Sequence, residues 1–189
     1  MAAVKTIILI GPICSGKTSV AEIISEKLII PLCSIDDVRF SYYEEIGYEK
    51  EVQDEIKKRD GFRGVYQYWK PFEAHTVVRV LQDYENHVID FGGGHSVYEE
   101  EKLLEKIKGA LEKFKHVFLL LPSPDDEESV KVLNQRLREF TTDQEVLDVN
   151  EHFIRHPSNK VLAKQVVYTN GKSIEDVADE IMSRYTKQM

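Results

Sequence analysis

Residues 7–18 carry the clearest chemical signal in the sequence. Four apolar residues run into Gly11, and after four intervening residues Gly16-Lys17-Thr18 completes the pattern G-x-x-x-x-G-K-[ST]. Glycines allow successive backbone N–H groups to point at an anion, and a helix that starts near Lys17 adds the positive end of its dipole. We therefore expect the Lys17 ammonium to contact the β and γ phosphates of a nucleoside triphosphate and the Thr18 hydroxyl to bind Mg²⁺.

The segments on both sides of the loop support this interpretation. Residues 4–10 are expected to form a strand buried on both faces, because the apolar run that ends this segment is continuous rather than alternating. Residues 18–28 follow with apolar side chains at helical spacing. A chance glycine turn is the alternative, and the agreement of strand, spacing and helix disfavours it. The loop residues expected to contact the nucleotide are Gly11, Pro12, Ile13, Cys14, Ser15, Gly16, Lys17, Thr18 and Ser19.

Two carboxylates, Asp36 and Asp37, follow the second predicted strand at 29–35. The carboxyl end of a parallel strand faces the same crevice as the phosphate loop. At least one of these carboxylates is therefore a candidate for a role in catalysis. Capping of the next helix is the alternative role, and the two are compatible because only one carboxylate is needed for a cap.

Three consecutive glycines, Gly92-Gly93-Gly94, follow a third predicted strand at 88–91. Such a sequence lets the backbone approach a ligand closely, and an ordinary flexible turn is the weaker alternative. Lys70 lies in the aromatic stretch at 65–72. Aromatic side chains are more often core than ligand surface, but a cation among them remains a candidate for substrate binding. His95, beside the glycines, is expected to be a bystander rather than a general base.

Five short buried-type strands alternate with helices, which predicts a three-layer α/β/α fold around a five-stranded parallel sheet. We expect a single domain over 1–189 with two excursions from its core: a helical substrate-binding insertion at about 37–70, broken near Gly47, and a short lid at about 136–155. Within these excursions, residues 61–64 are expected to form a turn. The polar segment at 139–151 is expected to be mobile.

Bulk composition excludes several other classes of protein. The net charge of −8 argues against general affinity for nucleic acid or for an anionic membrane, so a phosphate site has to be local. No apolar run approaches the roughly 20 residues that span a bilayer. Cys14 and Cys33 lie in no metal-binding or disulfide pattern. We expect a cytoplasmic protein that is a monomer or a weak homodimer.

Taken together, these features resemble the shikimate kinase family within the nucleoside monophosphate kinase-like P-loop proteins, in collinear order over nearly the whole chain. The phosphate loop matches fully, and Gly92-Gly93-Gly94 match the family's triple-glycine substrate loop. Asp36 falls at the second acid of the family's D-x-D pattern, with Ser34 in place of the first acid. The resemblance implies that Asp36 orients or deprotonates the acceptor hydroxyl and assists in binding the metal.

The resemblance also implies two cations for the acceptor. Residues 68–73 resemble the family's E-F-R-R-x-E stretch, which places Lys70 where the family has the arginine that holds the substrate carboxylate. Arg155, in an R-x-P pattern, takes the place of a second substrate-binding arginine. Lysine cannot form the planar, bidentate contact that arginine makes with a carboxylate. This departure leaves the phosphotransfer core intact and argues against shikimate as the substrate.

On the nucleotide side, Arg136 matches the family's arginine that lies over adenine, and Thr169, Asn170 and Gly171 belong to the loop that borders it. The family's R-P-L lid motif is missing after Arg136, and Arg138 is the nearest substitute cation. Both arginines also lie near the end of a predicted helix at 125–139, where arginine is favourable in any case.

These assignments predict an ATP- and Mg²⁺-dependent kinase that phosphorylates a hydroxyl of a small polar or anionic metabolite, with Lys17, Asp36 and Arg138 as its catalytic residues. A kinase of nucleosides or nucleotides is one alternative, disfavoured because the segment at 37–70 holds only three arginines. A nucleotide-binding ATPase or switch without a small-molecule acceptor is another, and a degraded lid would suit it. Fold alone does not decide among these functions.

Overall fold

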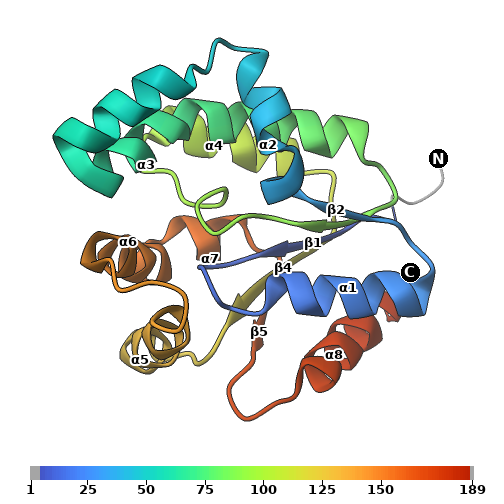
Figure 1. Ribbon diagram of the computed structural model, residues 1–189. Helices are drawn as coiled ribbons and strands as arrows, with labels where there is room; N and C mark the ends of the chain where they lie inside the picture. The colour runs from blue at the N-terminus through green and yellow to red at the C-terminus, as the bar shows by residue number, and fades with distance from the viewer. Residues whose placement is uncertain (1–4, 188–189) are drawn as a thin grey trace.

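The computed structural model describes residues 5–187 and has three layers, with a sheet between two groups of helices (Figure 1). The paired strands are all parallel, and their order across the sheet is β2-β3-β1-β4-β5. The predicted five-stranded parallel α/β fold is therefore confirmed. The strands are β1 (Ile7–Ile10), β2 (Leu32–Ser34), β3 (Val88–Asp90), β4 (His116–Leu121) and β5 (Gln165–Tyr168).

Helices cover both faces of this sheet. Helices α2, α3 and α4 lie on one side, and α1 and α8 lie on the other (Figure 1). The helices of the described residues are α1 (Lys17–Leu28), α2 (Ile35–Glu44), α3 (Lys50–Asp83), α4 (Glu101–Leu111), α5 (Asp126–Leu137), α6 (Gln144–Arg155), α7 (Ser158–Leu162) and α8 (Ile174–Thr186).

Strand β1 shows why the sequence at this point is apolar without interruption. Successive side chains of a strand point to opposite faces of the sheet. Ile8 and Ile10 pack into the core beneath α3 and α4, whereas Ile7 and Leu9 pack against α1 and α8. All four are fully buried. β1 is thus the central, fully buried strand of the sheet, and the phosphate loop begins where this strand ends.

The helical insertion contains both interruptions that the sequence predicts. The break near Gly47 lies between α2 and α3. Within α3, two helices meet at a kink at Gly61, which has φ 67° and ψ −161°, and the second helix runs through the aromatic stretch and Pro71 to Asp83. The interruption expected at 61–64 is therefore present, but it takes one residue rather than a four-residue turn, because glycine adopts positive φ without steric cost.

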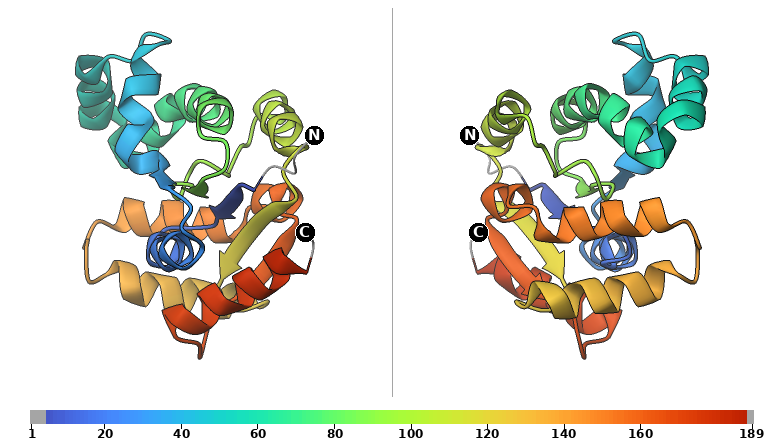
Figure 2. Two further views of the ribbon diagram at one scale, coloured as in Figure 1. Left: turned by 90° about the vertical axis from the view of Figure 1, so that its right-hand side faces the viewer. Right: turned by 90° about the vertical axis from the view of Figure 1, so that its left-hand side faces the viewer.

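Helix α6 begins within the polar segment at 139–151, for which the sequence analysis predicted mobility and no helix. Asp143 caps its first turn by accepting a hydrogen bond from the backbone of Glu145. The helix buries Leu147, Asn150 and Phe153, which recur every three residues and so lie on one face. Figure 2 shows α5 and α6 side by side. The sequence analysis did not predict this helix, because its apolar residues are spaced among many charged ones, as is usual in an amphipathic helix.

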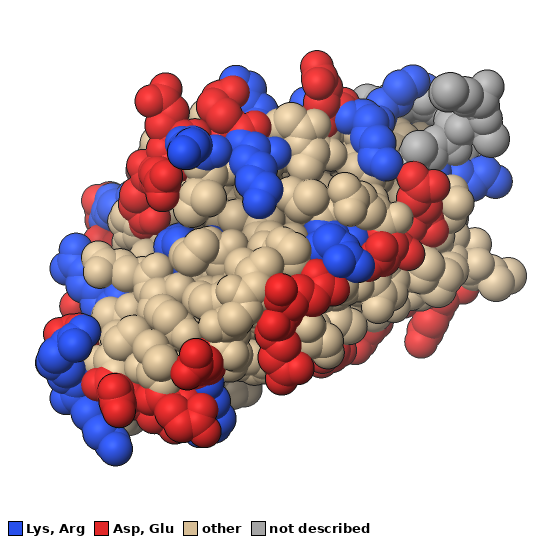
Figure 3. Space-filling view, turned by 90° about the horizontal axis from the view of Figure 1, so that it is seen from above, with Lys and Arg blue, Asp and Glu red and all other residues tan. Residues whose placement is uncertain are grey.

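The surface over α2, α3 and α4 carries charges of both signs. Lys and Arg side chains are interspersed with Asp and Glu there, so that neither sign forms a continuous surface on this face (Figure 3). Ion pairs such as Arg79–Glu45 and Lys113–Glu85 account for part of this pattern. Within residues 5–187, no helix is long and apolar enough to cross a membrane.

Candidate active site

The phosphate loop adopts backbone conformations that favour glycine. Gly11 has a φ of 145° and Gly16 a φ of 92°, and a Cβ on Gly11 would lie 2.6 Å from the carbonyl oxygen of Leu120. Helix α1 begins at Lys17, directly after Gly16, so its first unpaired N–H groups face the loop. The Lys17 ammonium donates a hydrogen bond across the loop to the carbonyl of Pro12, at 2.9 Å. This geometry fits the anion-binding role predicted for the loop.

Two helices from the second half of the chain hold the loop in place. The side chain of Asn150, on α6, accepts a hydrogen bond from the Ile13 N–H at 2.8 Å and donates one to the Ile13 carbonyl at 3.3 Å. Arg136, on α5, donates to the carbonyl of Cys14 at 3.2 Å. Sequence reasoning missed Asn150. The available signal was a polar residue at a buried position of an amphipathic pattern, because such a residue needs hydrogen-bond partners.

Asp90, at the end of β3, is a second residue that sequence reasoning missed. The Thr18 hydroxyl donates to its Oδ2 at 2.6 Å, while its Oδ1 is buried without a hydrogen-bond partner among the described residues. Burial raises the pKa of the Asp90 carboxyl, and the Lys17 charge and the Thr18 hydrogen bond oppose that rise. Carboxylate and hydroxyl oxygens suit Mg²⁺, and an unpartnered buried oxygen is where a cation would be bound. The rule that drew attention to Asp36, a carboxylate at the carboxyl end of a strand, would also have found Asp90.

A cavity of about 410 Å³ lies between the phosphate loop, α2, α3 and the glycine loop after β3. It brings together several predicted site residues, namely Ile13, Cys14, Lys17, Thr18, Asp36, Gly93 and Gly94. The other residues that line it are Arg39, Phe62, Tyr66, Trp69, Glu73, Asp90, Phe91, His95 and Phe153. Phosphate-binding groups and a carboxylate thus share one small enclosure with aromatic walls.

The structure distinguishes between the two neighbouring acids after β2. Asp36 lines the cavity, whereas Asp37 does not. Oδ1 of Asp36 lies 3.5 Å from Nη1 of Arg39, one helical turn further along α2. Neither acid is the N-cap of α2, because Ser34 occupies that position. The carboxylate of Asp36 is therefore the one placed to meet a ligand in the cavity.

The glycine loop requires small residues because other groups approach it closely. A Cβ on Gly92 would lie 2.5 Å from Oδ1 of Asp36 and 2.6 Å from Nδ1 of His95. A Cβ on Gly93 would lie 2.6 Å from the Ile13 side chain and 3.1 Å from the Ile13 nitrogen. The loop thus packs directly against both the acid and the phosphate loop.

Gly92→Ala is expected to lower the turnover number of the enzyme about tenfold or more, because the added methyl group displaces Asp36 and even an ångström of misplacement is costly in catalysis. Thermal unfolding should show that the variant still folds. Gly109→Ala is the matched control, since a Cβ there meets no atom within 4 Å. In a helix this substitution is expected to raise the free energy of unfolding by roughly 0.5–1 kcal/mol and to leave turnover intact. Wild-type turnover in Gly92→Ala would contradict the role of the glycine loop.

His95 is buried beside the cavity, and both of its ring nitrogens lack a hydrogen-bond partner among the described residues. Burial lowers the pKa of His95 to about 3. The imidazole is thus neutral in the folded protein at neutral pH, whereas it binds a proton below pH 6.5 once the chain unfolds. The free energy of unfolding should therefore fall as the pH drops from about 6.5 towards 3.

His95→Gln is expected to remove part of this acid sensitivity. Between pH 6.5 and 4.5 the wild type should lose about 2 kcal/mol more unfolding free energy than the variant. Urea unfolding at several pH values measures the difference. His87→Gln, which retains His95, should keep the wild-type slope. Parallel pH profiles for His95→Gln and the wild type would show that His95 is not the group responsible.

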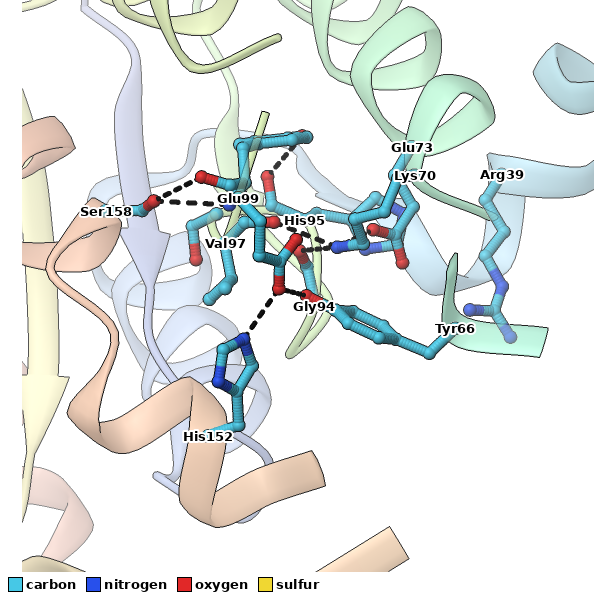
Figure 4. A network of polar contacts seen from close by, with 12 residues as sticks. Arg39, Tyr66, Lys70, Glu73, Gly94, His95, Val97, Glu99, His152 and Ser158 are labelled. Atoms are coloured by element: carbon cyan, nitrogen blue, oxygen red, sulfur yellow. Dashed lines mark hydrogen bonds and ion pairs between the residues drawn. The ribbon is translucent and has the colours of Figure 1, made fainter. Parts of the chain in front are cut away.

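The Lys70 ammonium is held by groups of the protein itself. It donates to the carbonyls of Gly94 and Val97, both at 2.9 Å, and forms an ion pair with Glu73 (Figure 4). Its ammonium also lies 4.2 Å from the centre of the Tyr66 ring. Lys70 is buried and is not among the residues that line the cavity at the phosphate loop. The structure thus places Lys70 behind the glycine loop, which it binds from the side away from that cavity.

The remaining predicted cations lie outside the cavity. Arg155, at the end of α6, forms ion pairs with Glu127 at 2.8 Å and Glu151 at 2.9 Å. Arg138 caps the end of α5 and is exposed. The structure does not bring Arg155 together with Asp36 and Lys17 as the acceptor site would require. Its predicted role in substrate binding therefore depends on a rearrangement of α6.

The predicted adenine-side loop follows β5, where Asn170 donates to Glu128 at 2.8 Å. The buried hydroxyl of Thr169 has no hydrogen-bond partner among the described residues. Gly171 has a φ of 76°, which favours glycine in the turn that follows. These residues do not line the cavity that contains Asp36. This agrees with a contact to the adenine of the nucleotide, as predicted, rather than to its phosphates.

A larger cavity of about 630 Å³ lies between α3, α6 and the segment before α4. Tyr66 lines both cavities, but the larger one contains no residue of the phosphate loop and neither Asp36 nor Asp90. Size alone does not identify the active site here. The smaller cavity is the candidate because the phosphate-binding and acidic groups meet in it.

The fold and the phosphate loop together define a P-loop protein with the architecture of small-molecule kinases. No protein-family model matches the chain. In sequence it is similar to a shikimate kinase of Francisella tularensis subsp. novicida (strain U112), at 22% identity over 183 residues that cover 96% of this chain and 94% of the relative. The resemblance predicted from the motifs is confirmed over nearly the whole chain, at low sequence identity.

Solved structures show the same fold. A shikimate kinase from Acinetobacter baumannii in complex with shikimate superposes with a TM-score of 0.65 and 18% identity, covering 98% of this chain and 94% of that one. A gluconokinase from Sinorhizobium meliloti 1021 superposes with a TM-score of 0.58 and 13% identity, covering 100% of this chain and 95% of that one. One architecture thus accommodates kinases named for two different hydroxy acids, and the fold leaves the acceptor open.

Proposed function

We propose that this protein is an ATP-dependent kinase that transfers the γ-phosphoryl group to a hydroxyl of a small polar or anionic metabolite. The observation that carries the proposal is the meeting of Lys17, Asp36 and the glycine loop in one cavity of about 410 Å³. The similarity to shikimate kinases over 96% of the chain supports it. The size of the cavity suits a small molecule better than a macromolecule.

Each residue has a distinct part in the proposed reaction. The loop N–H groups and Lys17 hold the β and γ phosphates and stabilise the negative charge of the transition state. Asp36 accepts a hydrogen bond from the acceptor hydroxyl and takes its proton during transfer. The aromatic walls exclude water, which would otherwise compete as acceptor. Arg136 supplies positive charge beside the phosphate loop, to which it donates a hydrogen bond. Arg138, exposed at the end of α5, does so when the lid region at 136–155 closes over the nucleotide.

A divalent cation fits the oxygens beside the phosphate loop. Thr18 and Asp90 would hold Mg²⁺, with Asp36 close by, and the unpartnered Oδ1 of Asp90 is the observation that supports this. When bound, Mg²⁺ neutralises charge on the phosphates and thereby favours transfer.

The excursions from the core have parts in this proposal as well. The insertion at 37–70 supplies Arg39, Phe62 and Trp69 to the cavity, which fits a substrate cap. Within the region at 136–155, α6 supplies Phe153 to the cavity and Asn150 to the phosphate loop, which fits a lid that senses the nucleotide. Both excursions belong to one domain over 1–189 in this proposal.

The two cysteines bear on the compartment in which the protein works. Cys14 and Cys33 are free, which fits a reducing compartment such as the cytoplasm, where ATP is available. We propose a monomer or a weak homodimer whose partner is the small acceptor itself.

The test is a comparison of acceptors by ADP release. Purified protein with ATP and Mg²⁺ is supplied in turn with hydroxy acids such as shikimate and D-gluconate, with neutral sugars, and with nucleosides and nucleoside monophosphates. Acceptor-stimulated ADP release by a hydroxy acid or a sugar supports the proposal. Stimulation by nucleosides or nucleotides alone would favour the nucleotide-kinase alternative. Tight ATP binding without stimulation by any acceptor would favour a nucleotide-binding switch.

A further inference from the structure

The acceptor site lacks the cation that the resemblance predicted for it. Lys70 has three N–H donors, and its partners in the structure are the two carbonyls of Gly94 and Val97 and the carboxylate of Glu73 (Figure 4). Two of these donors are thus in hydrogen bonds with the segment 94–97, and the positive charge is paired with Glu73. An ammonium so held is a positioning group for the glycine loop rather than a substrate contact.

Arg39 lines the cavity at the phosphate loop. It belongs to α2, three residues after Asp36, so the two side chains share a helix face. Figure 4 shows the Arg39 side chain in front of α3, apart from the network around Lys70. Its guanidinium lies 4.8 Å from the ring centres of both Phe40 and Trp69, and this stacking fixes the orientation of the group.

The Arg39 guanidinium has few partners among residues 5–187. It interacts with the buried Tyr43 hydroxyl, but the two groups form no hydrogen bond of ordinary geometry. Nε of Arg39 is buried without a hydrogen-bond partner among the described residues. The nearest carboxylate oxygen, on Asp36, is 3.5 Å from Nη1, which is longer than an ordinary hydrogen bond. A buried donor without a partner is costly. A bound ligand that supplies acceptor atoms would remove that cost.

Other charged groups of the cavity interact with one another or with the phosphate loop, to which Lys17 donates a hydrogen bond at Pro12. Glu73 is paired with Lys70, and Asp90 accepts a hydrogen bond from Thr18 and lies in the field of Lys17. Arg39 is thus the cation of the cavity that is oriented, partly buried and short of acceptors. A planar guanidinium of this kind suits the two oxygens of a carboxylate or phosphate.

We propose that Arg39 binds an anionic group of the phosphoryl acceptor, a carboxylate or a phosphate, and so takes over the part that Lys70 cannot play. This inference rests on the proposed kinase function and narrows it to acceptors that carry an anion near the reacting hydroxyl. Because Arg39 and Asp36 are one helical turn apart, the hydroxyl and the anionic group are close together on the acceptor. Phe62, Trp69 and Phe153 surround the carbon skeleton between them.

The experiment measures binding of four named probes to the full-length protein saturated with MgADP. Calorimetric titrations use shikimate and D-gluconate as carboxylates, D-glucose 6-phosphate as a phosphate, and D-glucose as a neutral compound. The wild type should bind at least one anion and should bind it at least tenfold more tightly than D-glucose. The probe that binds most tightly shows whether the site recognises a carboxylate or a phosphate.

Two variants of Arg39 then test the residue itself. Arg39→Met is expected to weaken binding of that anion about tenfold or more, and Arg39→Lys to weaken it by an intermediate factor because the bidentate contact is lost. Arg59→Met is the matched control, since Arg59 is an exposed arginine of α3 bonded to its neighbour Asp60. It should bind the anion as the wild type does. Circular dichroism of each variant verifies that the chain is folded.

The outcomes separate this inference from the kinase function. Unchanged anion binding in folded Arg39→Met, equal binding of D-glucose and the anions, or no saturable binding of any anion would each overturn the role of Arg39. If MgADP binds to the wild type in those cases, the nucleotide half of the kinase function stands. Failure of MgADP to bind the wild type would overturn both proposals.

Discussion

Lys17→Ala is expected to lower the rate of phosphoryl transfer by about 10³-fold, because removal of one preorganised charge at a reacting centre typically costs about 10²–10³ in turnover or more. Lys17 is buried at the start of α1 and faces the phosphate loop. Burial lowers the pKa of its ammonium, and the charges of Asp90 and Asp36 oppose that shift. Steady-state ADP release, with the acceptor found in the panel of compounds, measures the loss.

Lys27→Ala is the matched control for this prediction. Lys27 lies on the same helix, but its side chain is exposed and paired with Asp179 on α8. Its removal should leave turnover unchanged, since exposed ion pairs contribute little. Activity near the wild-type level in Lys17→Ala would rule out phosphoryl transfer at this loop.

Asp36→Asn is expected to lower turnover by about 10²–10⁴-fold, the usual contribution of a positioned general base. Asparagine has the same shape and still accepts a hydrogen bond, but it cannot take the proton of the acceptor hydroxyl. The Michaelis constant for ATP should change little, because the phosphate loop is untouched. Steady-state kinetics with each substrate varied in turn separates these two effects.

Asp37→Asn is the matched control, because the sequence alone did not distinguish Asp37 from Asp36. Asp37 follows directly in the chain, yet it does not line the cavity. Its substitution should therefore leave turnover within about twofold of the wild type, well below the effect of losing a general base. A large loss of turnover in Asp37→Asn, together with normal turnover in Asp36→Asn, would show that Asp37 is the general base and would contradict the assignment made from the cavity.

The parts of the site that were predictable are those in which local sequence dictates geometry. The spacing from Gly11 to Thr18 requires a particular loop, and the structure has positive φ at both of its glycines. Carboxylates that follow a parallel strand have to face the ligand-binding edge of the sheet. This rule placed Asp36 in the cavity, and its application to β3 would have added Asp90.

The parts that were missed depend on contacts between distant segments. Asn150 bonds to Ile13 across 137 positions of the chain. The amphipathic pattern around Asn150 indicates that it needs a partner, but no local pattern identifies Ile13 as that partner. Arg39 acquires its orientation from Trp69, which lies thirty positions later on another helix. These roles arise from the packing of α2 and α6 against the core rather than from any motif.

Lys70 illustrates a different source of error. Its position within a family-like stretch suggested a substrate contact, whereas the chain buries it in an ion pair with Glu73, three residues along the same helix. That spacing was visible in the sequence, because residues three apart on a helix are neighbours. A lysine and a glutamate at this spacing among aromatic residues indicate an internal pair as readily as a binding site.

Phosphorus NMR of the complete reaction tests the central claim most directly. The full-length protein is incubated with ATP, Mg²⁺ and the acceptor that stimulates ADP release most strongly. We expect a new phosphate monoester resonance to appear in the same amount as ADP, with little inorganic phosphate. ADP accompanied only by inorganic phosphate, or no consumption of ATP with any acceptor in the panel, would contradict the claim that this protein phosphorylates a small-molecule hydroxyl.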